Sequence, residues 1–404
     1  MILNIKRVIK VNKIVVVGGG FSGLVSAISA KKDNNEVIVL EKRNIVGKKI
    51  LVTGNGRCNY YNEVQENKFY HSSNEDFVSD IKDDTHMVLD FYNNLGIIPY
   101  VKDGYYYPYS KEASTIRNAL EKKCNELGIK IITDYKVESI KKENDSFIIN
   151  NDITCDKVIV GTGSIAYYKD DEQLIGYNIA KSFGHSIIKL LPSLVQLKGN
   201  GNYYKKWAGV RSDAIVSLYV DNYLINKEKG EVMLTDYGLS GICIFNLSGH
   251  ASRSLDLGLD VRVDINFLPW LNENIYKFLE NRDGSIEYVL SGMLNSKLVS
   301  LILELCNINK DKLFKDLSDS EKDLLVDHLL NFKVNINGVN DFDKAQVVSG
   351  GIDTKEIDKD TYESKLVKGL YFVGEILDVD AICGGYNITF ATLSGIKAGS
   401  DASK

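Results

Sequence analysis

Three glycines near the amino terminus, Gly18, Gly20 and Gly23, form a GxGxxG pattern that is typical of pyrophosphate binding. The apolar run Ile14–Val17 predicts a buried strand before them, and the residues after Gly23 predict a helix. Glycines at these positions permit a tight turn and a close approach of the backbone to the phosphates. The free N–H groups and the positive dipole end of the following helix then bind the anion.

A second apolar segment, EVIVLEK, follows this predicted helix and carries Glu41 near its end. A carboxylate at the end of the second strand, about twenty residues after the glycines, is placed to bind ribose hydroxyl groups. A glycine-rich loop alone is a weak signal, because such loops also merely connect elements. The complete strand–helix–strand unit is more specific, so we predict that Glu41 binds ribose. The alternative is that Glu41 is a solvated strand end.

A second pair of glycines stands near the carboxyl terminus, in the segment GGYN at residues 384–387. The segment LYFVGE before it predicts another buried parallel strand, and the small residues after it predict a helix. FAD extends beyond one nucleotide-binding unit and needs further walls, which a returning strand and helix supply. The helix N-terminus would stabilise negative charge at flavin N1 and C2=O, so we predict that Gly385, Tyr386 and Asn387 do this. The alternative is that the glycines only permit helix packing.

The elements that must position these residues suggest an interrupted α/β domain. Ser110 is a predicted N-cap for a helix that Gly128 ends, and residues 129–164 predict successive strands that continue the parallel sheet. From about Leu190 the chain is rich in strand patterns, and from Pro269 it is helical. We therefore predict a discontinuous, doubly wound, Rossmann-like domain with two inserts. Its parts are residues 1–189 and 346–404, and the inserts are a β-rich part (190–268, with a return at 334–345) and a helical part (269–333).

One stripe in the helical part consists of five apolar residues at helical spacing. We interpret it as core, not as a partner groove. Its members are Leu294, Leu298, Leu301, Ile302 and Leu305.

The composition narrows the class of protein. The chain has 404 residues, 44% of them hydrophobic and 25% charged, as in ordinary globular proteins. The formal net charge of −5 argues against a general nucleic-acid or anionic-membrane binder. Six cysteines without a CxxC pair, and the lack of a signal or membrane-spanning segment, predict a cytoplasmic protein. The oligomeric state is left open.

The sequence gives little support for a metal site, a serine-hydrolase site or a catalytic thiol. The five histidines are scattered, and we find no metal-ligand cluster and no Ser-His-Asp arrangement in the sequence. Cys58 lies in a glycine-rich loop without an adjacent thiol, so we interpret it as a packed side chain; the alternative is a thiol that cycles through a sulfenic acid. No second strand-GxGxxG-helix unit is present, so an NAD(P)H donor would have to bind transiently at the flavin.

Several ordered motifs resemble one known family. GGGxxG, GKKILVTGNGRCN, GEVMLTDYGLSG, VVSGGID, ESKLVKGLYFVGEILDVD and GGYN together are similar to the bacterial flavoproteins of the BaiN/RdsA type, also called HI0933-like or aminoacetone-oxidase-like. The resemblance implies a discontinuous FAD domain with an inserted β-barrel-like part and a helical part. It also implies that the loop Thr53–Asn59 lies along the flavin, that Gly374, Glu375 and Asp378 lie near the ribityl chain and pyrophosphate, and that the Val137 backbone meets the adenine.

The motifs and the resemblance together predict a set of FAD-binding residues. They are Gly18, Gly20, Phe21, Ser22, Gly23, Glu41, Lys42, Lys49, Thr53, Gly54, Asn55, Gly56, Arg57, Cys58, Asn59, Val137, Thr162, Gly163, Gly374, Glu375, Asp378, Gly385, Tyr386, Asn387 and Ile388.

The predicted function is that of an FAD-dependent oxidoreductase acting on a small organic substrate. The family has been linked to amine or amino-acid oxidation and to the reduction of unsaturated steroid-like acids, and the sequence does not choose between them. Asp236 stands where the family often has histidine, and Ile242 where proline is usual, so no proton-transfer residue is assigned. The alternatives are a flavin-dependent tRNA methyltransferase, which the acidic balance disfavours, and a non-catalytic flavin redox sensor.

Overall fold

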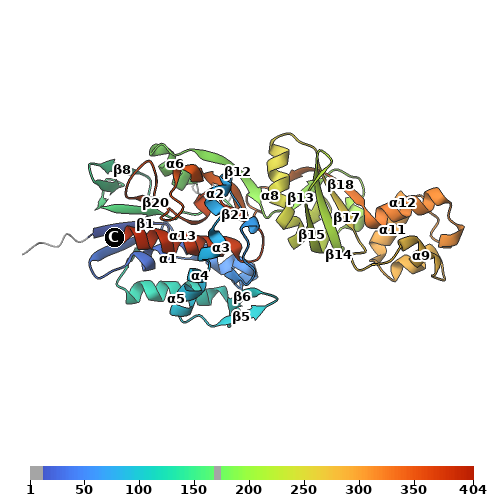
Figure 1. Cartoon of the computed structure of the whole chain (residues 1–404), viewed down its shortest axis with the longest axis horizontal. Coiled ribbons are helices and arrows are strands. Elements are labelled where there is room, and N and C mark those ends of the chain that lie inside the picture. Colours follow the sequence, from blue (N-terminus) through green and yellow to red (C-terminus); the bar gives the residue numbers. More distant parts are fainter. Residues whose placement is uncertain (1–11, 168–173) are drawn as a thin grey trace, which may run out of the picture. The chain divides into compact units, whose positions relative to one another are not determined.

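The computed structural model describes residues 12–167 and 174–404, which form two compact units (Figure 1). The first unit contains the chain up to Leu190 together with Val348–Lys404, and the second contains Leu191–Val347. The first unit is thus discontinuous in sequence, and the second unit stands between its two parts in the chain. Each unit has its own cluster of buried apolar side chains.

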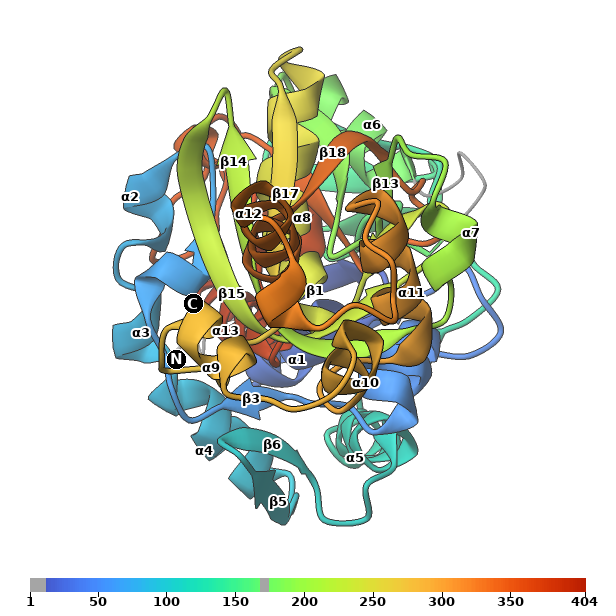
Figure 2. The same cartoon turned by 90° about the vertical axis from the view of Figure 1, so that its right-hand side faces the viewer.

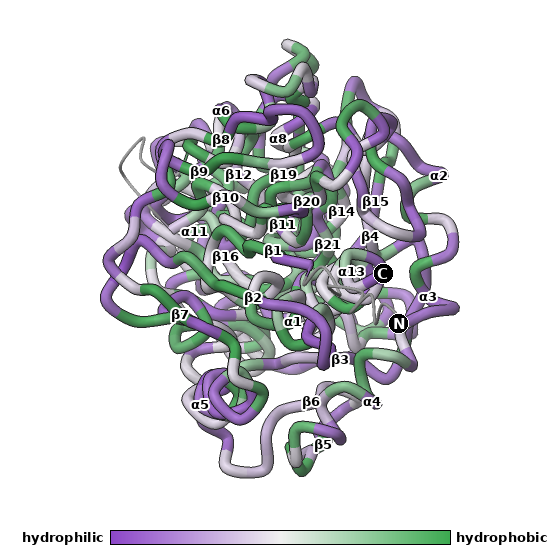
Figure 3. The backbone as a smooth tube through the Cα atoms, turned by 90° about the vertical axis from the view of Figure 1, so that its left-hand side faces the viewer, coloured by the Kyte–Doolittle hydropathy of each residue, from purple (hydrophilic) through white to green (hydrophobic). Residues whose placement is uncertain are grey.

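A five-stranded sheet forms the centre of the first unit, in the order β20–β11–β1–β2–β7 with every neighbouring pair parallel. The four residues Ile14–Val17 are at most 3% exposed, and Val16 pairs with Val39 on one side and Ile159 on the other. Such apolar, β-branched strands are typical of a parallel sheet covered on both faces (Figure 3). The five predicted strands are β1 (Asn12–Val17), β2 (Asn35–Leu40), β7 (Lys130–Ile132), β11 (Lys157–Val160) and β20 (Leu370–Phe372).

Two helices from opposite ends of the chain, α1 (Phe21–Ala30) and α13 (Tyr386–Ala402), lie side by side in this unit (Figure 1). Glycines of α13 allow the close approach, because a Cβ atom on Gly395 would lie 2.8 Å from the Ser22 carbonyl oxygen. A Cβ atom on Gly399 would lie 2.4 Å from the Ser26 carbonyl oxygen. The small residues of the last helix therefore serve its packing on α1.

The strands between β7 and β11 form a sheet of their own, in the antiparallel order β10–β9–β8. The expectation that residues 129–164 simply continue the parallel sheet is therefore wrong for this middle part. Their alternating burial, with Phe147 and Ile149 buried on β9, shows that only one face of this sheet is covered. The three strands are β8 (Ile140–Glu143), β9 (Ser146–Ile149) and β10 (Ile153–Cys155).

The helix predicted after Ser110 exists as α5 (Ala113–Glu126), but its N-cap residue is Glu112. Ser110 instead accepts a hydrogen bond from the Glu112 N–H at 3.3 Å and forms a turn before the helix, so the predicted cap was wrong. The predicted end is confirmed, because Gly128 follows the last turn with a φ of +68°.

The remaining elements of the first unit are short. The chain leaves the unit through β12 (Ile187–Ser193) and returns through β19 (Val347–Ile352), and these two strands pair. The others are β3 (Tyr61–Asn62), β4 (Tyr70–His71), β5 (Pro99–Lys102), β6 (Tyr105–Pro108), β21 (Asp380–Ala381), α2 (Glu75–Val78), α3 (Ile81–Asp84), α4 (His86–Asn94), α6 (Ile175–Ser182), and the 3₁₀ helices η1 (Lys48–Gly56), η2 (Asn67–Phe69), η5 (Thr354–Glu356) and η6 (Gly374–Ile376).

The second unit is built on a closed antiparallel barrel of six strands, in the order β13–β16–β15–β14–β17–β18, which confirms the barrel expectation. Along β14 every second residue is buried from Ala214 to Val220, as a strand of a packed barrel requires. The strands are β13 (Leu197–Gly199), β14 (Arg211–Val220), β15 (Tyr223–Leu234), β16 (Gly238–Ser240), β17 (Val261–Asn266) and β18 (Phe332–Val339).

A long helix, α8 (Ile242–Asp256), contacts five of the barrel strands and was not expected within the β-rich segment (Figure 2). Its buried residues Cys243, Ile244, Leu247 and Ala251 recur at helical spacing and pack into the barrel core. Glycine at 241, with a φ of +111°, makes the turn from β16 into this helix.

Short helices follow in the part predicted to be helical. The core interpretation of the apolar stripe is confirmed for Leu298, Leu301 and Ile302, and for Leu294, which is buried although it precedes the helix; it is wrong for Leu305, which is 39% exposed. The helices are α7 (Tyr204–Trp207), α9 (Ile275–Glu280), α10 (Ile286–Ser291), α11 (Ser296–Leu305), α12 (Asp319–Leu330) and the 3₁₀ helix η4 (Phe314–Asp316). Within residues 12–167 and 174–404, no helix combines the length and the apolarity needed to cross a bilayer.

Candidate cofactor site

Predicted site residues follow the carboxyl end of each strand of the parallel sheet. Gly18 comes directly after β1, Glu41 directly after β2, Thr162 shortly after β11, and Gly374 shortly after β20. Val137 follows β7 by a short segment. Because the carboxyl ends of parallel strands share one edge, residues that are far apart in sequence meet there, where α/β sheets bind ligands.

The three glycines of the first loop differ in what surrounds them. A Cβ atom on Gly18, whose φ is +102°, would lie 2.5 Å from the Gly161 carbonyl oxygen, and one on Gly23 would lie 1.9 Å from the Gly18 carbonyl oxygen. A Cβ atom on Gly20 would meet its nearest neighbouring atom only at 4.0 Å. The first and third glycines are thus required by packing, whereas the second leaves open space at the start of α1, as a bound pyrophosphate requires. Phe21 and Ser22 form the first turn of that helix.

Glu41 is buried, with 9% of its surface exposed, so its interpretation as a solvated strand end is wrong. Its Oε2 accepts a hydrogen bond from the Gly19 N–H at 2.7 Å, and its Oε1 accepts one from the Arg43 N–H at 2.9 Å. The carboxylate is therefore held against the glycine loop, and each oxygen retains acceptor capacity for a hydroxyl group.

The segment that carries Val137 lies beside Glu41. The Tyr135 N–H donates to the Glu41 carbonyl oxygen at 2.9 Å, and Val137 itself is buried. Lys42, next to Glu41, is half-buried. The structure thus brings together the residues predicted to bind the adenosine end of FAD.

Lys49 and Glu375, predicted from separate motifs, form an ion pair with 2.7 Å between Lys49 Nζ and Glu375 Oε2. Gly374, the neighbour of Glu375, approaches α1 closely, because a Cβ atom there would lie 2.5 Å from Ser22 Oγ. The Gly374 N–H donates to Ser394 Oγ of α13 at 3.0 Å. The turn after β20 is therefore fixed between the two long helices.

The loop Thr53–Asn59 leaves helical geometry at Thr53, and Gly54, Asn55 and Gly56 have positive φ angles. Gly54, Asn55 and Arg57 are exposed. The loop ends against the start of α13, where a Cβ atom on Gly385 would lie 2.9 Å from Asn59 Oδ1. The two segments predicted to contact the flavin are thus neighbours.

The side chains at the start of α13 are occupied by other parts of the first unit. The Tyr386 hydroxyl donates to the Val64 carbonyl oxygen at 3.0 Å. Asn387 accepts from the Ala381 N–H at 3.0 Å and donates to the Ala381 carbonyl oxygen at 2.8 Å. What Tyr386, Asn387 and the partly buried Ile388 offer a ligand is therefore the set of backbone N–H groups in the first turn.

The predicted residues also contain buried polar atoms that lack a hydrogen-bond partner. In the described part of the chain seven side-chain atoms are of this kind, and four belong to predicted residues: Asn59 Oδ1, Thr162 Oγ1, Glu375 Oε1 and Asp378 Oδ1. A buried polar group without a partner destabilises a protein by about 1 to 3 kcal/mol, so such a concentration indicates a polar ligand. Together with the space at Gly20, these atoms fit a ligand with phosphates and hydroxyl groups, as FAD has.

Several ionisable groups at the site have shifted pKa values, among them Tyr386, whose pKa burial raises. Burial raises the pKa of the Cys58 thiol to about 12, although a hydrogen bond with Thr53 acts in the opposite direction. Cys58 is therefore a neutral, fully buried thiol at neutral pH, which favours its packed interpretation over a redox role. Burial also raises the pKa of the Asp378 carboxyl, although the Ser73 N–H and His71 lower it.

A Ser-His-Glu arrangement lies elsewhere in the first unit, where the sequence analysis expected none. His185 Nε2 lies 2.8 Å from Ser364 Oγ, and His185 Nδ1 lies 3.0 Å from Glu356 Oε2. Ser364 Oγ also accepts hydrogen bonds from the Leu366 and Val367 N–H groups. Because the serine and histidine are buried and the serine oxygen is engaged, this network ties the segment after α6 to the loop after β19.

Tyr177 of α6 lies outside the predicted set, but its hydroxyl is another of the seven unpartnered atoms. The segment IGYN around it matches no binding motif, and only its burial in the structure marks it.

Comparison with known proteins identifies the family of this chain. The family model described as "HI0933-like protein Rossmann domain" matches residues 12–401. The chain is 34% identical to the 3-dehydro-bile acid delta(4,6)-reductase of Clostridium scindens, covering 97% of this chain and 99% of that protein. It is 28% identical to the ribosomal RNA dihydrouridine synthase of Haemophilus influenzae, covering 93% and 95%.

Among solved structures, the fold is similar to the 3-ketosteroid-delta4-(5alpha)-dehydrogenase of Rhodococcus jostii. The TM-score is 0.51 at 12% identity, covering 97% of each chain, and this likeness concerns the fold alone. The family match over nearly the whole chain, together with the bile-acid reductase relative, carries the assignment. The chain therefore belongs to the HI0933-like family and is an FAD-dependent oxidoreductase.

Proposed function

We propose that this protein reduces a carbon–carbon double bond conjugated to a carbonyl group in a small hydrophobic ketone, such as a steroid-like acid. The observation that carries the proposal is the 34% identity to a 3-dehydro-bile acid delta(4,6)-reductase over nearly the full length of both proteins. That name describes a ketone and two carbon–carbon double bonds. The name of the second relative describes the saturation of a double bond in uridine. The reactions named for both relatives thus share the reduction of a double bond polarised by a carbonyl group.

The residues of the first unit have separate tasks in this proposal. When bound, FAD supplies the two-electron chemistry. The open start of α1 at Gly20 holds the pyrophosphate, and Glu41 holds the adenosine ribose. The N–H groups at the start of α13 stabilise negative charge at the flavin ring.

We further propose that reduced nicotinamide cofactor is the electron donor and binds transiently. The sequence contains one strand-GxGxxG-helix unit, and FAD occupies it in this proposal. A donor that shares the flavin face must leave before the ketone binds, so donor and substrate should compete. A cytoplasmic location, expected from the cysteines, would supply such a donor.

Reduction of a uridine in RNA is the second candidate. It is supported by the 28% identity to the ribosomal RNA dihydrouridine synthase over 93% of this chain. The formal net charge of −5 counts against it, because a polyanionic substrate is repelled by a net negative protein. We therefore consider a uridine in RNA a less favoured substrate than a small ketone.

The test is an anaerobic reaction in two steps. The FAD-loaded protein is first mixed with NADH or NADPH, and the loss of flavin absorbance identifies the donor. The reduced protein is then mixed with a 3-oxo steroid acid that has double bonds at positions 4 and 6, or with the saturated 3-oxo acid as the matched control. Return of the flavin absorbance with the unsaturated acid alone, and a product heavier by two hydrogens per turnover, is the expected result.

Other outcomes separate the candidates. Reoxidation by a uridine-containing ribosomal RNA fragment, and not by the unsaturated acid, would replace the first candidate by the second. Reduction of the flavin by amines or amino acids, with oxygen as the acceptor, would contradict both.

A further inference from the structure

Three segments of the first unit that pack together, the end of β11, helix α6 and helix η6, each carry a buried oxygen atom without a hydrogen-bond partner: Thr162 Oγ1, Tyr177 OH and Glu375 Oε1. Gly176, the neighbour of Tyr177, lies against both other segments. A Cβ atom on it would lie 2.0 Å from Thr162 Oγ1 and 2.6 Å from Ile376 Cδ1, next to Glu375. Burial raises the pKa of the Tyr177 hydroxyl, and the Glu375 charge raises it further.

Each of these oxygens lacks a hydrogen-bond partner within the described residues. Tyr177 is 2% exposed, and phenylalanine would fill the same space without burying an unsatisfied hydroxyl group. A buried hydroxyl group without a partner needs an explanation, and for Tyr177, which lies in the same unit as the predicted FAD residues, a polar ligand would supply one. The other oxygen of Glu375 is held by Lys49 at 2.7 Å, so the carboxylate is fixed in place with Oε1 left over.

The hydrogen-bonding properties of the three oxygen atoms indicate which part of a ligand they would bind. A carboxylate oxygen accepts hydrogen bonds and repels phosphate, whereas hydroxyl groups both donate and accept. A set of one carboxylate and two hydroxyl groups therefore suits a chain of alcohols better than a pyrophosphate. The ribityl chain of FAD is such a chain.

We propose that Tyr177 is an FAD-binding residue outside every binding motif of this sequence, and that its hydroxyl, beside Thr162 and Glu375, bonds a hydroxyl group of the ribityl chain. This inference rests on the FAD site of the proposed function. It adds to that site a contact from α6, a helix that the cofactor motifs do not include.

The test compares Tyr177→Phe with Tyr204→Phe in the full chain. Tyr204 is the control, because it is also a buried tyrosine but lies in the barrel unit, away from the predicted FAD residues. Apoprotein of each variant is titrated with FAD, and binding is followed by the quenching of flavin fluorescence. Tyr177→Phe should weaken FAD binding by about five- to tenfold, the scale of one lost neutral hydrogen bond. Tyr204→Phe should leave the affinity unchanged.

A second measurement separates a lost ligand contact from a damaged fold. Without FAD, Tyr177→Phe should melt at the same temperature as the wild type or higher, because it removes an unsatisfied hydroxyl group. With FAD, its melting temperature should rise less than that of the wild type. Equal FAD affinity of wild type and Tyr177→Phe would overturn the inference, as would a lower melting temperature of the variant apoprotein.

The ribityl assignment is tested with FAD analogues that lack one ribityl hydroxyl group at a time. One analogue should bind the wild type more weakly than FAD does, yet bind Tyr177→Phe as well as it binds the wild type. If Tyr177→Phe lowers the affinity for FAD and for every analogue by the same factor, Tyr177 does not bond the ribityl chain. A wild type that binds FAD but does not reduce the unsaturated ketone would remove the proposed reaction and leave this inference standing.

Discussion

The two glycine-rich helix starts of the first unit have opposite surroundings. At the start of α1, a Cβ atom on Gly20 would meet nothing closer than 4.0 Å, so the helix end is open toward a ligand. At the start of α13, a Cβ atom on Gly385 would lie 2.9 Å from both Asn59 Oδ1 and the Tyr61 nitrogen, so the glycine is closed in by the chain. The glycine at the start of α1 thus leaves space for a ligand. The glycine at the start of α13 instead leaves space for the protein loop that is predicted to line that ligand.

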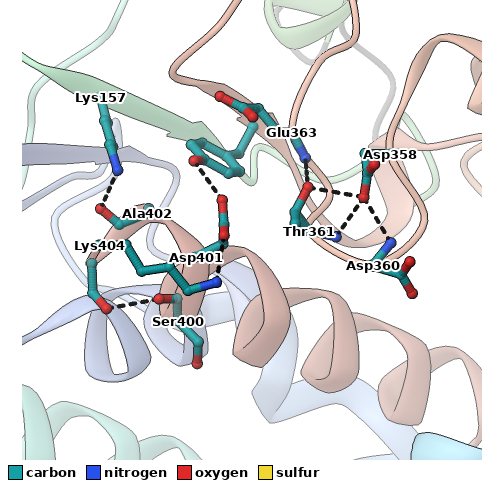
Figure 4. A network of polar contacts seen from close by, with 11 residues as sticks. Lys157, Asp358, Asp360, Thr361, Glu363, Ser400, Asp401, Ala402 and Lys404 are labelled. Carbon is teal, nitrogen blue, oxygen red and sulfur yellow. Dashed lines mark hydrogen bonds and ion pairs between the residues drawn. The ribbon is translucent and has the colours of Figure 1, made fainter.

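Helix α13 is fixed along its whole length, which suits a helix whose start must be held in place. Its middle packs on α1 through Gly395 and Gly399. Its last turn is tied to the sheet, because Lys157 Nζ donates to the Ala402 carbonyl oxygen at 3.0 Å and the Tyr371 hydroxyl donates to Asp401 at 3.0 Å (Figure 4). A cation at the carboxyl end of a helix also complements its dipole.

The largest effect is expected from Gly23→Ala compared with Gly20→Ala. The Gly23 variant places a Cβ atom 1.9 Å from the Gly18 carbonyl oxygen, so we expect a loss of more than ~3 kcal/mol of unfolding free energy. Gly20 has a φ of −82° that alanine adopts, so Gly20→Ala should change that free energy by less than ~1 kcal/mol.

The Gly20 variant should nevertheless bind FAD at least ~10-fold more weakly, because its methyl group occupies the space left for the phosphates. Urea unfolding of the apoproteins and titration with FAD measure the two effects. Normal FAD affinity in Gly20→Ala would show that the open helix start is not the pyrophosphate site.

Gly385→Ala tests the closed helix start. Its φ of +96° and the close Asn59 and Tyr61 atoms together predict a loss of about 2 to 4 kcal/mol in urea unfolding. Gly128→Ala is the control for backbone strain alone, because its φ is +68° and nothing lies within 4 Å, and it should lose only about 1 to 2 kcal/mol. Equal losses for the two variants would mean that the loop ending at Asn59 does not press on the start of α13.

The sequence predicted the elements whose signals are local. Apolar runs mark the five parallel strands, and glycine spacing marks the loop before α1, so both predictions were confirmed. Helix α8 was missed, because its segment mixes β-forming residues with glycine and its helical form depends on packing against five barrel strands. The proposed role of Tyr177 could not be predicted either, since α6 meets the end of β11 and helix η6 only through the tertiary fold.

Glu41→Ala should weaken FAD binding by about 1 to 3 kcal/mol, the scale of losing hydrogen bonds from ribose to a charged acceptor. The variant also removes the acceptor of the hydrogen bond that the Gly19 N–H donates to Glu41 at 2.7 Å. Part of the loss of FAD affinity therefore reflects a looser glycine loop. Glu41→Gln keeps an acceptor there and should lose less. Glu36, exposed on the same strand, provides the control Glu36→Ala, which should bind FAD normally. Titration of the apoproteins with FAD measures these affinities. An unchanged affinity in Glu41→Ala would show that Glu41 does not bind the ribose.

The smallest expected effect is the change of folding stability with pH. It distinguishes polar groups that are satisfied within the protein from polar groups that need a ligand. His185 is satisfied within the protein by Glu356 and Ser364, unlike the unpartnered oxygens of the cofactor site. Burial lowers the pKa of His185 below its ordinary value of 6.5, although Glu356 acts in the opposite direction, so the folded state favours the neutral ring. As the pH falls through 6.5, the unfolded chain takes up a proton before the folded chain does.

The contribution of His185 to stability is therefore complete above pH 6.5 and is lost as the pH falls toward the lower pKa of the folded state. Glu356 titrates in a separate range. Burial raises its pKa, but hydrogen bonds from Ser186 and His185 outweigh this and hold it below its ordinary 4.5, so its contribution is lost only at lower pH. Urea unfolding between pH 5 and 7 should show the decline in the wild type and a flatter profile in His185→Gln. Because this network needs no ligand, FAD should raise stability by the same amount across that range. A decline that FAD abolishes would instead place the titrating group in the cofactor site.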